Sequence, residues 1–322
     1  MQPVRLALVG AGAMGANHAR VVATEPGVEL ACVVDTEPGR ARRLAERYGA
    51  AWNTDLAAAL DADGIIVATP PETHVGVALE VIAAGRPVLV EKPVATDPDS
   101  VAMLVEMSRR SHVPLMAGFV ERFNPVVVAA REHLEIHGPL RHLVAVRHSP
   151  PNPRISTGVV YDLLIHDLDL ILHLGGAGEV RRVSGATWRP DHDGMEEIAD
   201  CTLVMADGAV ATASSSRVGQ RKVREMRIVT PTVLMEVDLL RRTLTLYRHV
   251  THGSTLDRVG YQAETVIDIP FVRQEGEPLT LQLRTFCRLV RGELDPDPVR
   301  DRLVAPHRAA HAVLAEADVT VA

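Results

Sequence analysis

The feature that most constrains the fold of this chain is a glycine motif, Gly10-x-Gly12-x-x-Gly15, which directly follows an apolar segment at residues 4–9. Gly10 permits a tight turn, Gly12 lets the backbone approach a pyrophosphate, and Gly15 lets a helix pack close to the preceding strand. The N–H groups at the start of that helix attract phosphate. The motif therefore predicts a dinucleotide-binding unit at the N-terminus.

Strands and helices alternate over the first 118 residues. The pattern predicts short apolar strands at 4–9, 28–34, 64–68, 87–90 and 114–118. It predicts helices at 16–24 and 38–48, a helix ending near 84, and a helix at 97–111 that begins with an Asp cap. Such alternation indicates right-handed βαβ units and a parallel sheet that helices cover on both faces.

The pattern changes after Gly118. Longer segments become rich in β-branched residues, and they predict strands at 140–148, 180–188, 199–205, 209–216, 224–230 and 243–248. Asp207-Gly208 predicts a hairpin turn between two of them. We expect an α/β chain in two domains: a doubly wound Rossmann domain at 1–120, and an α+β domain for substrate binding and oligomerisation at 121–322. The second domain should contain a large, open, mostly antiparallel sheet.

Composition excludes some functions. Lys and Arg total 34 against 41 Asp and Glu, a net charge of −7, which argues against nucleic-acid or membrane-surface partners. Cys32, Cys201 and Cys287 are far apart and show neither metal-site nor disulfide spacing, so we expect a reducing cytoplasm. No apolar run approaches the ~20 residues of a membrane span. We read the apolar N-terminus as part of the nucleotide motif, not as a signal peptide.

Asp35 lies 20 positions after Gly15, at the end of the second expected strand. A carboxylate there accepts hydrogen bonds from the adenosine ribose and repels a 2′-phosphate, which favours NAD over NADP. Arg40 is close enough in sequence to weaken that preference, so NADP stays possible. A plain helix cap is the alternative role for Asp35.

A loop containing Thr69, Pro70 and His74 follows the third expected strand. Ligands bind at the carboxyl edge of such sheets, so this loop could cover the nicotinamide ribose. It could equally be the start of a helix, with proline in the first turn and Thr73 as the cap.

Glu91-Lys92-Pro93 follows the fourth expected strand at the same edge. Burial and nearby cations would lower the pKa of Lys92, which makes it a candidate to give or take a hydroxyl proton. Pro93 stiffens the turn and permits a cis peptide bond. A surface lysine at a strand end is the alternative.

The segment 161–174, followed by two glycines, predicts a buried helix with a polar stripe. At roughly 100° per residue, Asp162, His166, Asp169 and His173 share one narrow face. Asp162 can contact His166 one turn later, raise the pKa of its imidazole and orient it as a general base. Asp169 could accept substrate hydroxyls. A purely structural cluster and a metal site are the alternatives. Asp167 fits neither and should pair at a helix or domain contact.

Three further polar residues lie outside these motifs. Arg122 and Asn124, near the domain junction, could meet cofactor and substrate or only tie the domains together. Arg154, in a proline-rich loop, could bind an anionic group such as phosphate or be a solvated loop residue.

Together these motifs resemble the Gfo/Idh/MocA oxidoreductase family, over almost the whole chain. The resemblance rests on Gly10-x-Gly12-x-x-Gly15, Thr69-Pro70 with His74, Glu91-Lys92-Pro93, Arg122-Phe-Asn-Pro125 and Asp162-x-x-x-His166-x-x-Asp169. It implies a Rossmann domain, an open-sheet domain, and reversible NAD(P)-dependent oxidation of a sugar or cyclitol hydroxyl. It also implies homodimers or homotetramers formed through the C-terminal sheets.

The resemblance implies that Lys92 and His166 handle the proton, that Asp162 is the partner of His166, and that Asp169 contacts substrate. We expect Lys92 and His166 to face one cleft beside the nicotinamide, and we expect no metal. The expected cofactor contacts are Gly10, Gly12, Ala13, Met14, Gly15, Asp35, Thr36, Arg40, Thr69, Pro70, His74, Glu91, Lys92 and Arg122. The expected substrate contacts are Lys92, Asn124, Arg154, Tyr161, Asp162, His166 and Asp169.

The expected substrate is a small molecule. Residues 147–154 and 158–167 are similar to a branch that acts at the 3-hydroxyl of UDP-N-acetylglucosamine-type sugars, and a free sugar, a sugar phosphate or an inositol is also compatible. Two other functions fit part of the pattern. One is elimination or glycoside cleavage with tightly bound NAD. The other is a dinucleotide-binding sensor without turnover.

Overall fold

The structure is a computed structural model and describes residues 2–152, 157–176, 179–191, 194–252 and 262–317. The chain divides into two compact units. Unit 1 contains Met1–Val120 and Gly276–His311, and unit 2 contains Glu121–Glu275 and Ala312–Ala322. The first break falls at the expected boundary, whereas residues 276–311, expected in the second domain, belong to unit 1.

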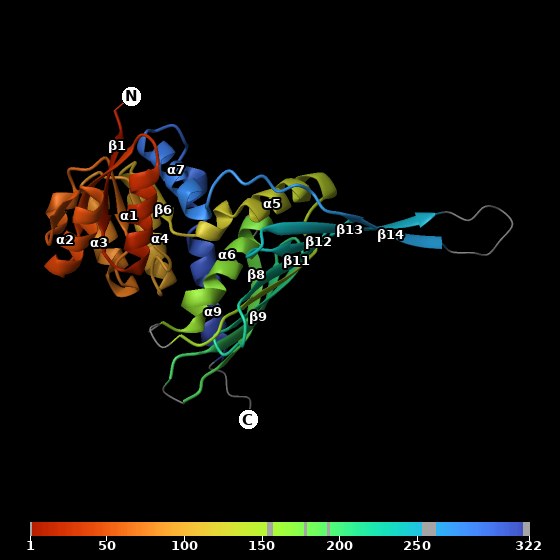
Figure 1. Ribbon diagram of the computed structural model, residues 1–322. Helices are drawn as coiled ribbons and strands as arrows, with labels where there is room; N and C mark the ends of the chain where they lie inside the picture. Colours follow the sequence, from red (N-terminus) through yellow and green to blue (C-terminus); the bar gives the residue numbers. More distant parts are fainter. Residues whose placement is uncertain (1, 153–156, 177–178, 192–193, 253–261, 318–322) are drawn as a thin grey trace. The chain divides into compact units, whose positions relative to one another are not determined.

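Unit 1 is built on a six-stranded parallel sheet in the order β3-β2-β1-β4-β5-β6. This is the predicted doubly wound Rossmann arrangement. Figure 1 labels β1 and β6 of this sheet among the helices that surround it. The strands are β1 (Val4–Val9), β2 (Val28–Val34), β3 (Ala51–Asn53), β4 (Gly64–Val67), β5 (Val88–Val90) and β6 (Leu115–Ala117). The three residues of β3 are exposed and lack an apolar pattern, which is why the sequence did not reveal this edge strand.

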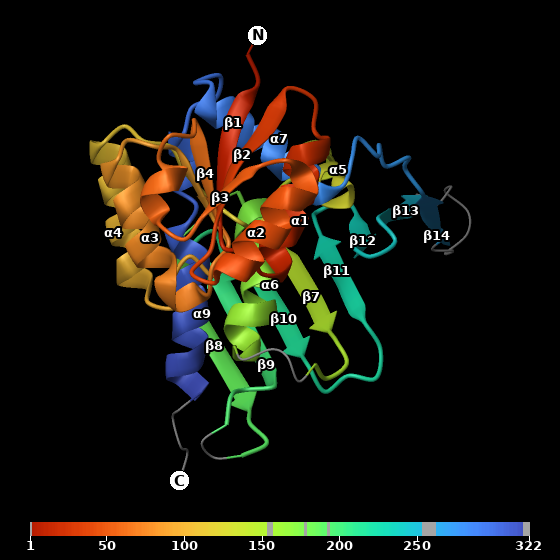
Figure 2. The same cartoon turned by 60° about the vertical axis from the view of Figure 1, so that its left-hand side comes forward.

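Helices cover both faces of this sheet. α1 (Ala13–Thr24), α2 (Pro38–Tyr48) and α7 (Pro278–Val290) lie together on one face, and α3 (Pro71–Ala83) and α4 (Pro98–Arg110) lie on the other (Figure 2). Asp97 caps α4 as predicted, since its carboxylate accepts the N–H groups of Asp99 and Ser100. The short helices η1 (Leu56–Ala59) and α8 (Asp297–Arg300) and the start of α9 (Val304–Ala317) complete the unit.

The packing of α7 explains why residues 276–311 join unit 1. The side chains of Phe286 and Val290 lie so close to Gly64, the first residue of β4, that a Cβ on that glycine would be 2.7 Å from Val290. Phe286 is fully buried. The apolar side of α7 therefore covers a part of the parallel sheet that the helices of residues 1–120 do not cover.

Unit 2 is built on an eight-stranded sheet in the order β14-β13-β12-β11-β7-β10-β9-β8. Within the described part of this second sheet, only the pair β7–β10 is parallel, so the expectation of a mostly antiparallel sheet is confirmed. The strands are β7 (His142–His148), β8 (Val180–Trp188), β9 (Ile198–Met205), β10 (Val210–Ser216), β11 (Val223–Val229), β12 (Leu234–Asp238), β13 (Thr243–His252) and β14 (Gln262–Asp268). The sequence analysis missed β12 and β14.

One face of this sheet is covered by helices. α5 (Pro125–His137) and α6 (Ile165–Leu174) lie across it, and η2 (Val120–Phe123) precedes α5 (Figure 2). Burial alternates along the central strands, so that Leu143, Ala145 and Arg147 of β7 are buried while the residues between them are partly exposed. The predicted Asp207-Gly208 hairpin joins β9 to β10, with Gly208 at φ +90°.

Candidate functional site

The register of the parallel sheet aligns the ends of four neighbouring strands. The last residues of β1, β2, β4 and β5 are level with one another. The residues that follow them are Gly10, Asp35, Ala68 and Glu91. Loops at the carboxyl edge of such a sheet form its ligand-binding crevice, so the register alone brings the main sequence motifs of unit 1 together.

The three motif glycines have different surroundings. Gly10 has φ +101°, and a Cβ there would be 2.5 Å from the carbonyl oxygen of Ala68. A Cβ on Gly15 would overlap the carbonyl oxygen of Gly10, whereas a Cβ on Gly12 would have no atom within 4 Å. Gly10 and Gly15 are thus required by packing, while Gly12 leaves open space at the start of α1, where a phosphate could approach.

Asp35 is hydrogen-bonded to this loop. Its Oδ2 accepts the N–H of Ala11 at 2.7 Å, and its Oδ1 accepts the N–H of Glu37 at 2.9 Å. The cap position of α2 is Glu37, so the alternative of Asp35 as the helix cap does not describe this structure. Each carboxylate oxygen has a second lone pair, which can still accept a ribose hydroxyl.

A cavity of about 490 Å³ lies beside Asp35 and the glycine loop. It brings together seven of the expected cofactor contacts: Gly10, Gly12, Asp35, Thr36, Arg40, Thr69 and Pro70. Sequence reasoning missed Thr54, Leu56, Thr73 and Val77, which also line it. Thr54 and Leu56 follow the unrecognised strand β3. Of the other expected contacts, Ala13, Met14 and Gly15 form the first turn of α1.

The donor set of this cavity fits a dinucleotide. Gly12 caps α1 without a side chain, and the first turn of α1 carries no acidic residue, so its N–H groups face no negative side chain of their own helix. Asp35 presents carboxylate oxygens with lone pairs that can accept ribose hydroxyls, and Val9, Val34 and Leu56 supply apolar walls. The residues present can therefore hold NAD.

α3 begins at Pro71. The proline start that we considered is therefore present, but Thr73 is a residue of the helix and not its cap. Its hydroxyl donates to the carbonyl oxygen of Pro70 at 2.8 Å and lies within hydrogen-bond distance, 2.7 Å, of the Thr69 hydroxyl. These bonds order the Thr69-Pro70 wall of the cavity.

The carboxylate before Lys92 is turned into the protein. Glu91 is 5% exposed, and its Oε1 lies 2.7 Å from Nε2 of His18, a buried histidine on α1 that the sequence analysis did not identify. Its Oε2 accepts the N–H of Lys92 at 3.2 Å. A Cβ on Gly118 would be 2.6 Å from the same carboxylate. Glu91 therefore supports, from the buried side, the turn formed by residues 92–94, which we call the Lys92 turn.

Two more histidines contact this turn. Nδ1 of His74 lies 2.8 Å from the carbonyl oxygen of Pro93, and its Nε2 lies 2.8 Å from that of Thr69. Nε2 of His307, on α9, accepts the N–H of Val94 at 3.0 Å. The Lys92–Pro93 peptide bond is cis, the isomer that the sequence permitted.

In unit 2, the expected helix at 161–174 begins with a π-helical turn, η3 (Val160–Leu164), and only then continues as α6. The prediction of a regular α-helix is therefore wrong for the first turn, where Asp162 lies, and α-helical spacing does not place Asp162 relative to His166. The prediction of a buried helix is confirmed, because the leucines and isoleucines of 163–172 are all buried. π-helical turns occur frequently at functional sites.

Glu196 and Arg217 hold this turn, and the sequence analysis identified neither. The carboxylate of Glu196 accepts the N–H of Val160 at 3.3 Å, and a Cβ on Gly158 would overlap it. Arg217 is 3% exposed, and one of its guanidinium nitrogens lies 3.8 Å from Oδ2 of Asp162. Asp162 thus lies beside a buried cation.

Asp169 and Arg122, expected at substrate and cofactor respectively, form an ion pair with each other. Nε of Arg122 donates to both carboxylate oxygens of Asp169, at 2.9 and 3.0 Å. Asp169 is 1% exposed. The contact fixes α6 to the segment that precedes α5.

Asp167 has the partner that its position required. Arg147 donates to both of its carboxylate oxygens, at 2.9 and 3.0 Å, and to Glu121 at 3.1 Å. Burial acts to lower the pKa of Arg147, but Asp167 and Glu121 together raise it above its ordinary value. Asn124 caps α5, and its amide donates to Glu121 and to the Leu239 carbonyl, each at 3.1 Å.

Two expected substrate contacts remain. Tyr161 is 7% exposed and belongs to η3. Arg154 lies outside the described residues.

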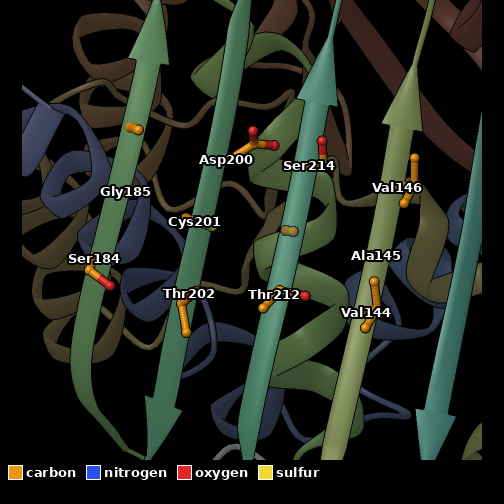
Figure 3. A pocket seen from close by; sticks show the side chains of 12 residues that line it. Val144, Ala145, Val146, Ser184, Gly185, Asp200, Cys201, Thr202, Thr212 and Ser214 are labelled. Atoms are coloured by element: carbon orange, nitrogen blue, oxygen red, sulfur yellow. The ribbon is translucent and has the colours of Figure 1, made fainter.

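The other face of the unit 2 sheet bears a shallow hollow across four strands (Figure 3). Short side chains line it, including Val144 and Val146 of β7, Thr202 of β9, and Thr212 and Ser214 of β10. It contains none of the expected site residues.

Within the described ranges, no helix is long and apolar enough to cross a membrane. The same ranges contain no group of three or more His, Cys, Asp or Glu side chains placed to hold a metal ion.

The fold of unit 1 and its cavity define a dinucleotide-binding domain. The family model described as "Oxidoreductase family, NAD-binding Rossmann fold" (GFO_IDH_MocA) matches residues 4–119, and the GFO/IDH/MocA C-terminal domain matches residues 137–231. The chain belongs to the Gfo/Idh/MocA oxidoreductase family.

Relatives with assigned activities align with most of the chain. UDP-N-acetylglucosamine 3-dehydrogenase of Acidithiobacillus ferrooxidans is 33% identical over 280 residues, 86% of this chain and 83% of the relative. scyllo-Inositol 2-dehydrogenase (NAD(+)) of Bacillus subtilis is 30% identical over 312 residues, 91% and 88% of the two chains. A crystal structure of the Acidithiobacillus enzyme superposes with a TM-score of 0.84 at 29% identity, covering 99% of this chain and 100% of that one.

Proposed function

We propose that this oxidoreductase transfers hydride between NAD and a secondary hydroxyl of a sugar, a nucleotide-sugar or a cyclitol. The observation that carries the proposal is the position of Lys92. It follows β5 at the same sheet edge where Ala68 and Thr69, after the neighbouring strand β4, line the dinucleotide cavity. The relatives named above act on a nucleotide-sugar and on an inositol, and a UDP-N-acetylhexosamine oxidised at its 3-hydroxyl is our first candidate.

In the proposed mechanism, NAD⁺ held by the glycine loop and Asp35 would supply the hydride acceptor for the carbon that carries the hydroxyl. His166 removes the hydroxyl proton, and Lys92 polarises the oxygen or relays the proton. Asp162 orients His166, and the guanidinium of Arg217 lies 3.8 Å from its carboxylate and supports it from the other side of the contact. The proposal requires that Lys92 and His166, from different units, reach the same hydroxyl.

The remaining expected contacts divide by their surroundings. We propose Tyr161 and Arg154 as substrate contacts. Arg122, Asp169 and Asn124 are held in contacts inside unit 2, and we propose that they shape the walls of the substrate site.

The lysine content of the chain supports a chemical role for Lys92. Lys92 and Lys222 are the only lysines, although Lys and Arg total 34. Apart from Lys222, arginine supplies the positive charge everywhere else, but a guanidinium cannot release a proton near neutral pH. Lys92 therefore differs from the arginines in carrying a proton that it can transfer, as the proposed chemistry needs.

A substrate screen tests the proposal. Sugars, sugar phosphates, UDP-sugars and cyclitols are incubated with NAD or NADP, and nicotinamide absorbance is followed. We expect net NADH formation with at least one of these classes. Product without NADH release would instead support elimination or glycoside cleavage with retained NAD, and binding without any product would support a sensor.

The same substitution at both lysines provides the matched control. Lys92→Arg keeps the charge but loses the transferable proton, so kcat should fall about 100-fold or more while NAD affinity is retained. Lys222→Arg should retain kcat. His166→Ala should also lose turnover with NAD binding intact. Full turnover in Lys92→Arg would remove Lys92 from the chemistry.

We also propose that two copies associate through the hollowed face of the unit 2 sheet. Its side chains are short and largely uncharged, which suits close packing of two sheets. A cytoplasmic location is part of the proposal and is supported by three buried, free cysteines.

A further inference from the structure

The proposed chemistry gives no role to the two histidines that contact the main chain beside Lys92. His74 comes from α3 and His307 from α9, 233 positions later. They are 1% and 0% exposed. His74 contacts the carbonyl oxygen of Pro93, and His307 contacts the N–H of the next residue, Val94. The two histidines thus hold both polar groups of one peptide unit.

The partners of His307 define its protonation state. Because Val94 donates to Nε2, that nitrogen carries no proton, and Nδ1–H donates to the carbonyl oxygen of Leu303 at 2.7 Å. The ring of Phe119 packs against the imidazole at a centroid distance of 5.7 Å. His307 therefore presents a fixed acceptor to the turn.

His74 joins the Lys92 turn to the wall of the dinucleotide cavity. Both of its ring nitrogens face carbonyl oxygens, those of Pro93 and Thr69, and Thr69 lines the cavity. A neutral imidazole can donate to one of them, and a protonated imidazole to both. Movement of the turn relative to the cavity would break one of these contacts.

We infer that His74 and His307 are positioning residues that fix the Lys92 turn relative to the dinucleotide cavity. The inference rests on the proposed role of Lys92. Its physical basis is that proton and hydride transfer need close alignment, so that a displacement of about 1 Å can reduce turnover roughly 100-fold. The alternative is that the histidines only satisfy two buried main-chain groups.

Amide substitutions test the contacts of the two ring nitrogens one at a time, because the side-chain amide of Asn reaches the position of Nδ1 and that of Gln reaches the position of Nε2. His307→Gln keeps an acceptor for Val94, whereas His307→Asn does not. His74→Asn keeps a donor to Pro93, whereas His74→Gln keeps only the donor to Thr69. We expect Gln to preserve kcat at position 307 and Asn to preserve it at position 74, with roughly tenfold or greater losses in the opposite variants.

A second readout needs neither substrate nor turnover. In protein labelled with ¹³C-lysine, the chain gives signals from two lysine side chains only, and Lys222→Arg leaves that of Lys92. We expect His307→Asn and His74→Gln to shift the Lys92 signal and its titration midpoint. The signal of Lys222 should not move. His311→Leu, an exposed site one turn further along α9, is the control that should shift neither.

The outcomes are distinguishable. Equal kcat in the Gln and Asn variants at each position, with an unmoved Lys92 signal, would overturn the inference even if the melting temperature falls. Full activity of Lys92→Arg in the same assay would instead overturn the proposed role of Lys92, on which the inference rests. If one variant at His74 or His307 is too unstable to assay, the Gln and Asn pair at the other histidine tests the inference. In a Lys92→Arg background, His307→Asn should lower kcat no further.

Discussion

The carboxylate of Asp35 accepts the main-chain N–H of Ala11 at 2.7 Å, which joins the end of β2 to the glycine loop after β1. Asp35 is thus a structural anchor of the loop as well as the proposed ribose acceptor.

Asp35→Ala should weaken NAD binding and reduce the preference for NAD over NADP. A hydrogen bond to a charged group contributes about 1.5–3 kcal/mol, so the Kd for NADH should rise at least about tenfold. Arg40→Ala should weaken NADPH binding and leave NADH binding nearly unchanged. Fluorescence titration with both cofactors measures this. An unchanged NADH Kd in Asp35→Ala would contradict the assignment.

Alanine at Gly12 should mainly weaken cofactor binding, whereas alanine at Gly15 should mainly lower the free energy of unfolding. A Cβ at Gly12 meets no atom within 4 Å, so Gly12→Ala should fold with a loss below about 1 kcal/mol. Its methyl group would occupy the phosphate approach and weaken NAD binding. Gly15→Ala would overlap the Gly10 carbonyl and should destabilise the fold by about 1–3 kcal/mol. Denaturant unfolding and cofactor titration distinguish the two, and a large stability loss in Gly12→Ala would count against this geometry.

Removal of the Asp167 carboxylate should strongly destabilise the chain. Arg147 is 1% exposed, and Asp167→Ala would leave its charge without its bidentate partner. Breaking a buried pair in this way costs about 3–5 kcal/mol. The control is Glu46→Ala, which breaks an exposed pair with Arg42 and should cost less than about 1 kcal/mol. Equal urea midpoints for the two variants would contradict the prediction.

The buried thiols should make the protein less stable in alkali. Burial raises the pKa of Cys201 to about 12 and that of Cys287 to about 11, and burial also raises the pKa of Cys32. The folded state therefore disfavours thiolates, and this contribution to stability is complete below the unfolded thiol pKa of about 8.5 and declines as the pH rises above it. At pH 8 a disulfide reagent should react slowly with native protein and rapidly with three thiols after denaturation. Rapid reaction of native protein would show that the thiols are accessible.

A charge on the hollowed sheet face should disrupt the proposed association. Thr212→Glu places a carboxylate in the hollow of that face, and two copies would bring like charges together. Light scattering coupled to size exclusion should show a smaller particle than the parent protein. Arg42→Glu, which introduces the same side chain on the exposed side of α2, is the control and should not alter the mass of the particle. A parent protein that is already monomeric would refute the association.

Local patterns in the sequence were sufficient for most of unit 1. Its strands are short and apolar, so their positions follow from hydrophobicity alone, and the glycine motif and Asp35 identify the nucleotide edge. β3 was missed because its three exposed residues carry no such pattern. Unit 2 was predicted less completely, since β12 and β14 depend on pairing with distant strands.

The sequence by itself determined most strands and helices of unit 1, the dinucleotide motif and the candidate residues for proton transfer, because these depend on neighbours within a few positions. Tertiary structure decided which polar groups meet. It assigned residues 276–311 to unit 1, replaced the first turn of the expected helix by a π-helical turn, and paired Asp167 with Arg147 and Asp169 with Arg122. It also brought His307 to the Lys92 turn. Such contacts join segments tens to hundreds of residues apart, and buried polar groups find those partners only when the whole chain has folded.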